Sequence, residues 1–192
     1  MPRCFGDGDA LYSAYHDDEW GHPVTTEHAI YERLSLEGFQ AGLSWITILR
    51  RREGFRAAFA QFDPELVARF GERDVARLLA DEGIIRHRGK IEATISNAAV
   101  VLGLREQGRP LDELFLAYLQ PARPAPVSFA SVPAKTPEST ALAKELKSHG
   151  WRFCGPTTAY AAMQACGLVN DHLAGCPVRE RTEVARQVLT AR

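Results

Sequence analysis

Residues 74–102, DVARLLADEGIIRHRGKIEATISNAAVVL, carry the strongest fold signal in the chain. The first and last parts of this stretch have apolar residues at helical spacing, and GIIRHRG between them is bounded by Gly83 and Gly89. The second part forms one apolar helix stripe at i, i+4, i+7 and i+11, from Ile91, Ile95, Ala98 and Leu102. The pattern predicts two helices joined by a short hairpin.

The hairpin is basic. The free N–H groups at the start of its second helix favour an anion, and four side chains add positive charge at the same place: Arg86, His87, Arg88 and Lys90. Such a site suits sequence-independent contact with a phosphate backbone. The alternative is an ordinary helix corner with a solvated basic turn. Three arginines at 50–52 either extend this surface or complement a helix dipole.

The rest of the pattern is also helical. Asp63-Pro64 and Thr136-Pro137 each place an N-cap residue before a proline at the first helical position, and Gly150 ends the second of these helices. Ser44 begins WITILRRR, and Gly155-Pro156 begins a helix that Gly167 ends. VSFASV (127–132) alternates like a strand, but the prolines around it predict a connector over 121–137. We therefore expect a mainly α fold.

Composition sets broad limits on the protein. Its 192 residues favour one domain, and 45% hydrophobic and 24% charged residues are typical of a soluble globular chain. The net charge of −1 restricts nucleic-acid binding to a local basic patch. No apolar run is long enough to span a membrane, and MPRCFGDGDA does not read as a secretory signal. We expect a cytoplasmic protein whose four cysteines are core residues or metal ligands.

Cysteine and histidine residues recur near both ends of the chain. Cys4 and His16 lie in the N-terminal part, and NDHLAGC contains His172 and Cys176 four residues apart. Two thiolates and two imidazoles make a closed tetrahedral zinc set, which is structural because it leaves no position for an activated water. The alternative is ordinary surface histidines and small buried cysteines. In the metal interpretation Asp17 and Asp18 are spectators; Cys154 and Cys166 are expected in the core.

Aromatic residues surround a carboxylate in two motifs. Tyr12, Tyr15 and Trp20 cluster near the start, and LEGFQAGLSW places Glu37 eight residues before Trp45. Such a set suits a planar, cationic or amine-bearing ligand, stacked by rings and hydrogen-bonded at its edge. The alternative is a core helix with a single exposed glutamate.

Four segments of the chain together resemble the bacterial DNA-3-methyladenine glycosylase I family, from about Arg3 to Cys176. These segments are CFG…LYSAYHDDEWG, LEGFQAGLSWITIL, GIIRHRGKI and MQACGLVNDHLAGC. The resemblance implies a helix-hairpin-helix glycosylase fold, with two helical lobes around a DNA-binding cleft and a structural zinc that joins the termini. Two departures are a slightly shorter loop between Cys4 and His16, and a tail without a counterpart. We therefore expect one glycosylase domain over residues 1–176 and a tail, 177–192, of unknown role.

The resemblance also implies roles for individual residues. Glu37 is the catalytic candidate, beside a base pocket formed by Tyr12, Tyr15 and Trp45. Leu43 plugs the gap left in the DNA stack, and the hairpin from Gly83 to Lys90, with Arg86, His87, Arg88 and Gly89, holds a phosphate. The zinc ligands are Cys4, His16, His172 and Cys176.

The implied reaction flips cationic 3-methyladenine out of alkylated double-stranded DNA and hydrolyses its N-glycosidic bond, leaving an abasic site. We expect a monomer without an obligate protein partner. Asp171, beside a zinc ligand, is not assigned a catalytic role.

Two other functions remain open at this point. A metal-dependent phosphohydrolase would use His16 and Asp17 as a catalytic pair, and would need an open metal position and further ligands. A non-catalytic, zinc-clasped DNA-binding module would use the basic hairpin alone. It would have no need for a buried carboxylate among aromatic rings.

Overall fold

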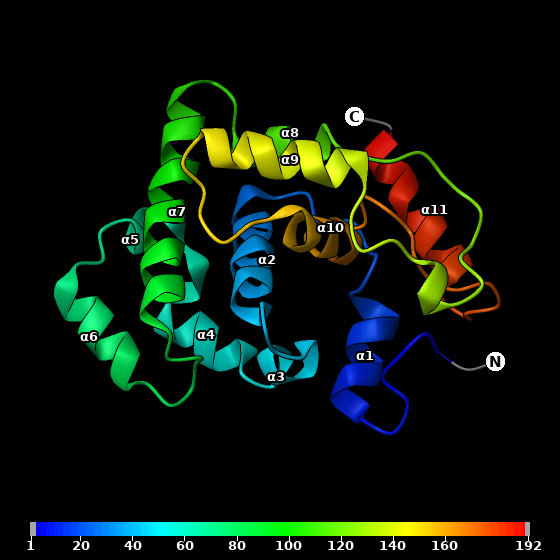
Figure 1. Ribbon diagram of the computed structural model, residues 1–192, viewed down its shortest axis with the longest axis horizontal. Helices are drawn as coiled ribbons and strands as arrows, with labels where there is room; N and C mark the ends of the chain where they lie inside the picture. Colours follow the sequence, from blue (N-terminus) through cyan, green and yellow to red (C-terminus); the bar gives the residue numbers. More distant parts are fainter. Residues whose placement is uncertain (1–2, 191–192) are drawn as a thin grey trace.

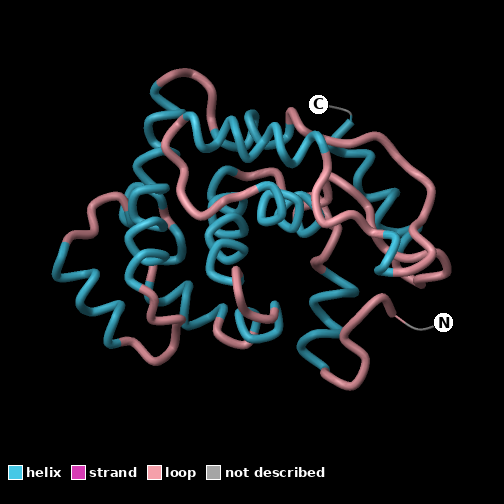
Figure 2. The backbone as a smooth tube through the Cα atoms, in the orientation of Figure 1, coloured by secondary structure: helices cyan, strands magenta, loops and turns pink. Residues whose placement is uncertain are grey.

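The computed structural model describes residues 3–190, and within this range it contains helices and loops but no strand (Figures 1 and 2). The mainly α fold expected from the pattern is confirmed. The elements are α1 (Ala10–Asp18), α2 (Glu27–Gln40), α3 (Trp45–Leu49), α4 (Arg52–Ala58), η1 (Ala60–Phe62), α5 (Pro64–Val67), α6 (Glu72–Ala80), α7 (Arg88–Glu106), α8 (Leu111–Leu116), η2 (Phe129–Ser131), α9 (Pro137–Ser148), α10 (Pro156–Ala165) and α11 (Arg179–Thr190). None of these helices has the length and apolar character needed to cross a membrane.

Helix α2 is the centre of the molecule, with α7 and α10 packed against it (Figure 1). Thr26 caps its first turn, because the Thr26 side chain accepts a hydrogen bond from the N–H of Ala29. Its side chains are buried around most of the circumference, which is the mark of a core helix rather than a surface helix. The fully buried set includes Ile30, Tyr31, Leu34, Leu36 and Phe39.

The predicted hairpin is present as α6, the turn 81–87 and α7. Of the expected apolar stripe, Ile91 and Ala98 are fully buried, whereas Ile95 and Leu102 are half-buried. The turn lies directly on α4: a Cβ on Gly54 would stand 2.5 Å from the carbonyl oxygen of Gly83. Glycine at position 54 therefore allows the two backbones to touch, which fixes the hairpin against the rest of the fold.

The predicted caps are confirmed on α5, α9 and α10. Asp63 accepts hydrogen bonds from the first turn of α5, and Thr136 accepts one from the N–H of Ser139 at the start of α9. Gly150 and Gly167 follow α9 and α10 with φ values of 93° and 77°. Ser44 precedes α3 but makes no capping bond; its hydroxyl pairs with that of Thr47 instead.

One of two ambiguous segments differs from the sequence prediction, and the other agrees with it. WITILRRR is not one helix, because the chain bends at Arg51 (φ −104°, ψ 1°) between α3 and α4, and Arg52 then pairs with Glu19. Residues 127–132 form part of a connector that contains the short turn η2, as the prolines on either side of them predict.

The C-terminal tail forms a helix over residues 179–190. Helix α11 places Thr182 and Arg186 in buried positions. The Arg186 guanidinium donates to the carbonyl oxygens of Gly167 at 2.7 Å, Gln120 at 2.7 Å and Leu168 at 3.0 Å. These three bonds attach α11 to the loop after α10 and to the proline-rich connector.

Candidate active site and metal centre

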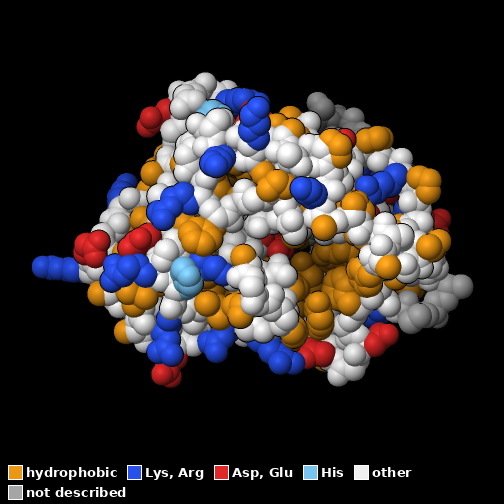
Figure 3. All heavy atoms as spheres, in the orientation of Figure 1, with side chains coloured by type: hydrophobic (Ala, Val, Ile, Leu, Met, Phe, Trp, Pro, Cys, Tyr) orange, Lys and Arg blue, Asp and Glu red, His pale blue; other side chains and the backbone are white. Residues whose placement is uncertain are grey.

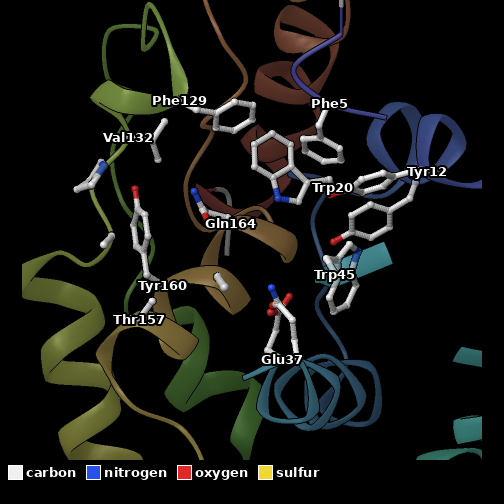
Figure 4. A pocket seen from close by; sticks show the side chains of 15 residues that line it. Phe5, Tyr12, Trp20, Glu37, Trp45, Phe129, Val132, Thr157, Tyr160 and Gln164 are labelled. Carbon is white, nitrogen blue, oxygen red and sulfur yellow. The ribbon is translucent and has the colours of Figure 1, made fainter. Parts of the chain in front are cut away.

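A cavity of about 500 Å³ opens beside α2, between α1, the start of α3, α10 and the connector. Figure 3 shows it as a hollow lined mainly by hydrophobic side chains, and Figure 4 shows the side chains that face it. The lining residues are Phe5, Tyr12, Tyr15, Trp20, Glu37, Gln40, Trp45, Phe129, Val132, Pro133, Ala134, Thr157, Tyr160, Ala161 and Gln164. The three residues that we expected in a base pocket and the catalytic candidate Glu37 therefore line one cavity.

Glu37 is the only ionisable carboxyl group in this lining. It rises from α2 toward the aromatic residues (Figure 4), is 5% exposed, and makes no hydrogen bond or ion pair with any residue in the range 3–190. Burial raises the pKa of Glu37 to about 8, although the nearby Arg33 guanidinium opposes this shift. The side chain therefore has unsatisfied hydrogen-bonding capacity directed at the cavity, which excludes the alternative of an exposed glutamate on a core helix.

The tyrosines and Trp45 form a continuous aromatic wall. The ring centroids of Tyr12 and Tyr15 lie 6.5 Å apart, and those of Tyr15 and Trp45 lie 5.3 Å apart. Helix α1 supplies the tyrosines at positions three apart, which face the same side of a helix, and α3 begins at Trp45. A planar ligand that enters the cavity meets stacking surfaces on this side and the Glu37 carboxyl at its edge.

Several lining residues were not identified from the sequence: Phe5, Gln40, Phe129, Tyr160 and Gln164. Tyr160 and Gln164 lie four residues apart on α10, so they share one face of the helix. This spacing could have indicated a polar face, but most residues around them are apolar and the helix reads as a core helix. Both are held from behind by Asp171, which accepts hydrogen bonds from the Tyr160 hydroxyl at 2.6 Å and the Gln164 amide at 2.8 Å. Asp171 is 2% exposed and also pairs with Arg123, so its carboxylate supports the cavity wall rather than facing the cavity.

The segment before and within α1 meets the loop between α10 and α11 at a Cys/His cluster. The ligand atoms of Cys4, His16, His172 and Cys176 all lie within 4.8 Å of one another. The Cys176 Sγ atom lies 3.5 Å from His16 Nε2 and 3.5 Å from His172 Nδ1, and Cys4 Sγ lies 3.6 Å from His172 Nδ1. Zinc bond lengths in a tetrahedron place sulfur and nitrogen about 3.6 Å apart, so the donor set fits zinc in type and spacing.

The hydrogen bonds around the cluster select the correct histidine tautomers. His172 Nε2 donates to the Trp20 carbonyl at 3.0 Å, which leaves Nδ1 unprotonated toward the cluster. His16 Nδ1 lies 2.8 Å from an Asp17 carboxylate oxygen, which leaves Nε2 for the cluster. Arg3 holds Asp17 in turn at 2.7 Å.

The expectation that Asp17 is a spectator is therefore wrong, because its carboxylate holds the His16 ring of the cluster. Asp18 is 70% exposed and solvated, as expected. This geometry also argues against a catalytic His16–Asp17 metal pair: His16 shares its site with two thiols, and Asp17 contacts the imidazole rather than the cluster.

The hairpin presents most of its predicted residues to solvent. Arg86 and Arg88 are 52% and 54% exposed, and His87 caps α7 by accepting a hydrogen bond from the N–H of Lys90. The N–H groups of Arg88 and Gly89 have no acceptor within residues 3–190. Leu43 is 41% exposed in the loop that follows α2.

Contrary to the sequence prediction, Lys90 does not add to the exposed positive charge of the hairpin. Its side chain is only 8% exposed, and the ammonium donates to the carbonyl oxygens of Phe39 at 2.8 Å and Ala41 at 2.7 Å. Lys90 therefore caps the C-terminal end of α2 and ties it to the hairpin, instead of adding its charge to the exposed basic surface.

Comparison with known proteins agrees with this geometry. Residues 5–180 match the methyladenine glycosylase family. DNA-3-methyladenine glycosylase 1 of Escherichia coli is 49% identical over 92% of this chain and 96% of its own length, and DNA-3-methyladenine glycosylase of Haemophilus influenzae is 42% identical over 92% and 97%. A crystal structure of 3-methyladenine DNA glycosylase I has a TM-score of 0.89 at 50% identity, covering 92% of this chain and 98% of that one.

A Staphylococcus aureus structure that concerns 3-methyladenine recognition has a TM-score of 0.87 at 34% identity, covering 92% of this chain and 95% of its own. The match to the family extends over helices α1 to α10 and includes His16, His172 and Cys176 of the cysteine–histidine cluster. The chain belongs to the methyladenine glycosylase family.

Proposed function

We propose that this protein excises 3-methyladenine from alkylated double-stranded DNA, by hydrolysing the N-glycosidic bond of a nucleotide flipped into the cavity beside α2. The observation that carries the proposal is the Glu37 carboxyl, buried and without a protein partner, at the edge of an aromatic wall. Burying an unpaired carboxyl group costs free energy of folding. A non-catalytic DNA-binding module would gain nothing in return for this cost, because it would have no use for the cavity.

Recognition uses both sides of the cavity. A base inside duplex DNA is out of reach, so the enzyme extrudes it at a cost of a few kcal/mol. Trp45, Tyr12 and Tyr15 stack on the cationic ring, and Glu37 accepts hydrogen bonds from its amino edge. The positive charge of the base favours the carboxylate form, so the arriving base lowers the pKa of Glu37 from its raised value in the empty cavity.

The reaction requires little acid or nucleophilic assistance, because the methylated base is already a cationic leaving group. The bond between C1′ and the base nitrogen breaks, and its electron pair neutralises the base. Water adds to C1′ and loses a proton, which leaves an abasic site. The contacts of Glu37 and the aromatic wall lower the barrier to the extent that they improve as this bond breaks.

DNA is held outside the cavity in this proposal. The helix-hairpin-helix element formed by α6 and α7 contacts a phosphate through the free N–H groups of Arg88 and Gly89, with Arg86 and His87 nearby. Leu43 enters the gap that the flipped nucleotide leaves. Its 41% exposed side chain, in a loop next to the cavity residue Trp45, supports this role.

The metal centre is structural in this proposal. Zinc held by Cys4, His16, His172 and Cys176 joins the chain ends, and four protein ligands leave it no position for substrate or water. The role of the bound zinc is therefore to hold α1, with Tyr12 and Tyr15, in place. The cytoplasmic location and the monomeric state stay predictions.

Glu37→Gln tests the proposed function. The substitution keeps the shape of the side chain and removes its negative charge, so we expect kcat/KM for release of 3-methyladenine from methylated DNA to fall by about 10²-fold. Binding of the variant to undamaged duplex DNA should not change. Release at the parental rate would remove Glu37 from the mechanism.

A further inference from the structure

The loop between α9 and α10 exposes an aromatic side chain in a strained conformation. Phe153 is 42% exposed, and its φ of 57° lies in the left-handed region that disfavours residues with a side chain. This conformation is strained for a residue with a side chain, and exposing a phenyl ring adds no compensating burial. Such strain, when it sits on a surface, suggests a functional role.

The surrounding residues hold this loop firmly. Asn97 of α7 is 3% exposed and makes two hydrogen bonds to the backbone of Arg152: its oxygen accepts from the N–H at 2.8 Å, and its amide donates to the carbonyl at 3.0 Å. Gly38 of α2 leaves room for the Phe153 carbonyl, since a Cβ there would stand 3.3 Å from that oxygen. The strained position is therefore set by α2 and α7 together.

The loop lies beside the hairpin. Figure 1 shows it running between α7 and α2. The Phe153 ring meets the His87 ring edge-on, with centroids 6.1 Å apart, and a Cβ on Gly89 would lie 3.5 Å from it. Lys90 links this place to the loop that carries Leu43, through its bond to the Ala41 carbonyl.

The charges at this place suit an anionic partner. Arg152 is exposed, and its guanidinium makes no ion pair or hydrogen bond with any residue in the range 3–190. The guanidinium of Arg86 is held only loosely, 3.9 Å from Glu82. The free N–H groups of Arg88 and Gly89 lie beside Phe153. A partner that combines phosphates with apolar sugar faces satisfies both the cations and the exposed ring.

We propose that Arg152 and Phe153 form a second contact to the DNA backbone, next to the phosphate held by the hairpin. The Phe153 ring packs against a deoxyribose, and the Arg152 guanidinium pairs with a phosphate of the same strand. This inference rests on the proposed function, because it assigns further DNA-contacting residues to the same enzyme.

The test measures binding of the full chain to a duplex that contains a stable abasic-site analogue, at several salt concentrations. Arg152→Ala should reduce the salt slope of binding by about one, as expected for one lost phosphate contact. Phe153→Gly should weaken duplex binding by about tenfold. Arg69→Ala and Leu66→Ala are matched controls, because both remove exposed side chains on the α5 side, and they should bind like the parent.

The melting temperature separates a binding role from a structural one. Glycine adopts φ 57° without strain, so Phe153→Gly should melt at or above the parental temperature while it binds duplex more weakly. Free 3-methyladenine should bind to both variants as it does to the parent.

Duplex binding and salt slopes equal to those of the controls would overturn this proposal alone. A fall in the melting temperature of Phe153→Gly that accounts for the lost affinity would overturn it as well. The absence of base release by the parent protein would instead overturn the proposed function, so the two failures are distinguishable.

Discussion

At the scale of single residues, burial of the Glu37 carboxyl group beside the cavity lowers the stability of the folded protein. Glu37 lies four residues after Arg33 on α2, and Arg33 is the one charged group that lowers its pKa. The Arg33 guanidinium is itself bound to Glu19 at 2.6 Å and lies 5.8 Å from the centre of the Tyr15 ring. This arrangement offsets only part of the desolvation, and the pKa of Glu37 remains near 8.

The raised pKa makes a prediction about stability. In the unfolded chain Glu37 ionises near pH 4.5, whereas in the folded protein it retains its proton until about pH 8. The folded state therefore binds more protons between these values, and this contribution to the free energy of unfolding is lost as pH rises through the window, by at most about 5 kcal/mol.

Glu37→Gln lacks this titration. Relative to the parent, the variant should gain stability progressively from pH 5 to pH 9, measured by urea unfolding at each pH. A stability difference that stays constant over this range would show that the carboxyl is not desolvated. Loss of base release together with this gain in stability would identify Glu37 as a residue kept for function.

The sequence predicted the aromatic–carboxylate site because its members lie in two short motifs, with the tyrosines at helical spacing. It did not predict Phe5, Phe129, Tyr160 or Gln164, since the chain brings these residues to the cavity only through tertiary packing. It also misjudged Asp17, because the contact with His16 and Arg3 depends on side-chain geometry that spacing does not determine.

At the scale of elements, the helix ends were predictable and the helix contacts were not. N-cap and proline signals located the starts of α5, α9 and α10, because the preference for these residues at a helix start depends on the local backbone alone. The bend between α3 and α4 occurs where Arg52 pairs with Glu19. Helix α11 is attached where Arg186 donates to three distant carbonyl oxygens. Both contacts join residues far apart in the sequence, so local patterns do not predict them.

Lys90 provides a test at this scale. Lys90→Met leaves the carbonyl oxygens of Phe39 and Ala41 without their donor in a buried place, which should lower the free energy of unfolding by about 1–3 kcal/mol. The salt slope of DNA binding should not change, because the ammonium does not reach the surface. A lower slope with unchanged stability would instead make Lys90 the phosphate ligand that the sequence pattern suggests.

At the scale of the whole molecule, the Cys/His cluster attaches the N-terminal segment to the loop after α10, and Arg186 attaches α11 to the same loop. The cluster holds α1 through His16, and the carbonyl of Trp20, whose ring lines the cavity, accepts a hydrogen bond from His172. A metal at this cluster therefore supports the aromatic wall from behind without facing the substrate.

Metal removal tests this arrangement. The purified protein should contain one equivalent of zinc, and stripping it should lower the melting temperature. Asp17→Asn weakens the orientation of His16, so we expect zinc affinity to fall by about 10–100-fold, measured by competition with a chromogenic chelator. Asp18→Asn is the matched control and should bind zinc like the parent. Protein without zinc, or equal affinity in both variants, would contradict a structural zinc site.

Base excision by this protein can be measured with DNA treated with a methylating agent. The parent protein and Glu37→Gln are incubated with this DNA after a brief exposure to chelator, and the released bases are identified by chromatography. The parent should release free 3-methyladenine and leave matching abasic sites, and the variant should release the base far more slowly. No free base from a folded, zinc-loaded parent protein would contradict the proposed excision of 3-methyladenine.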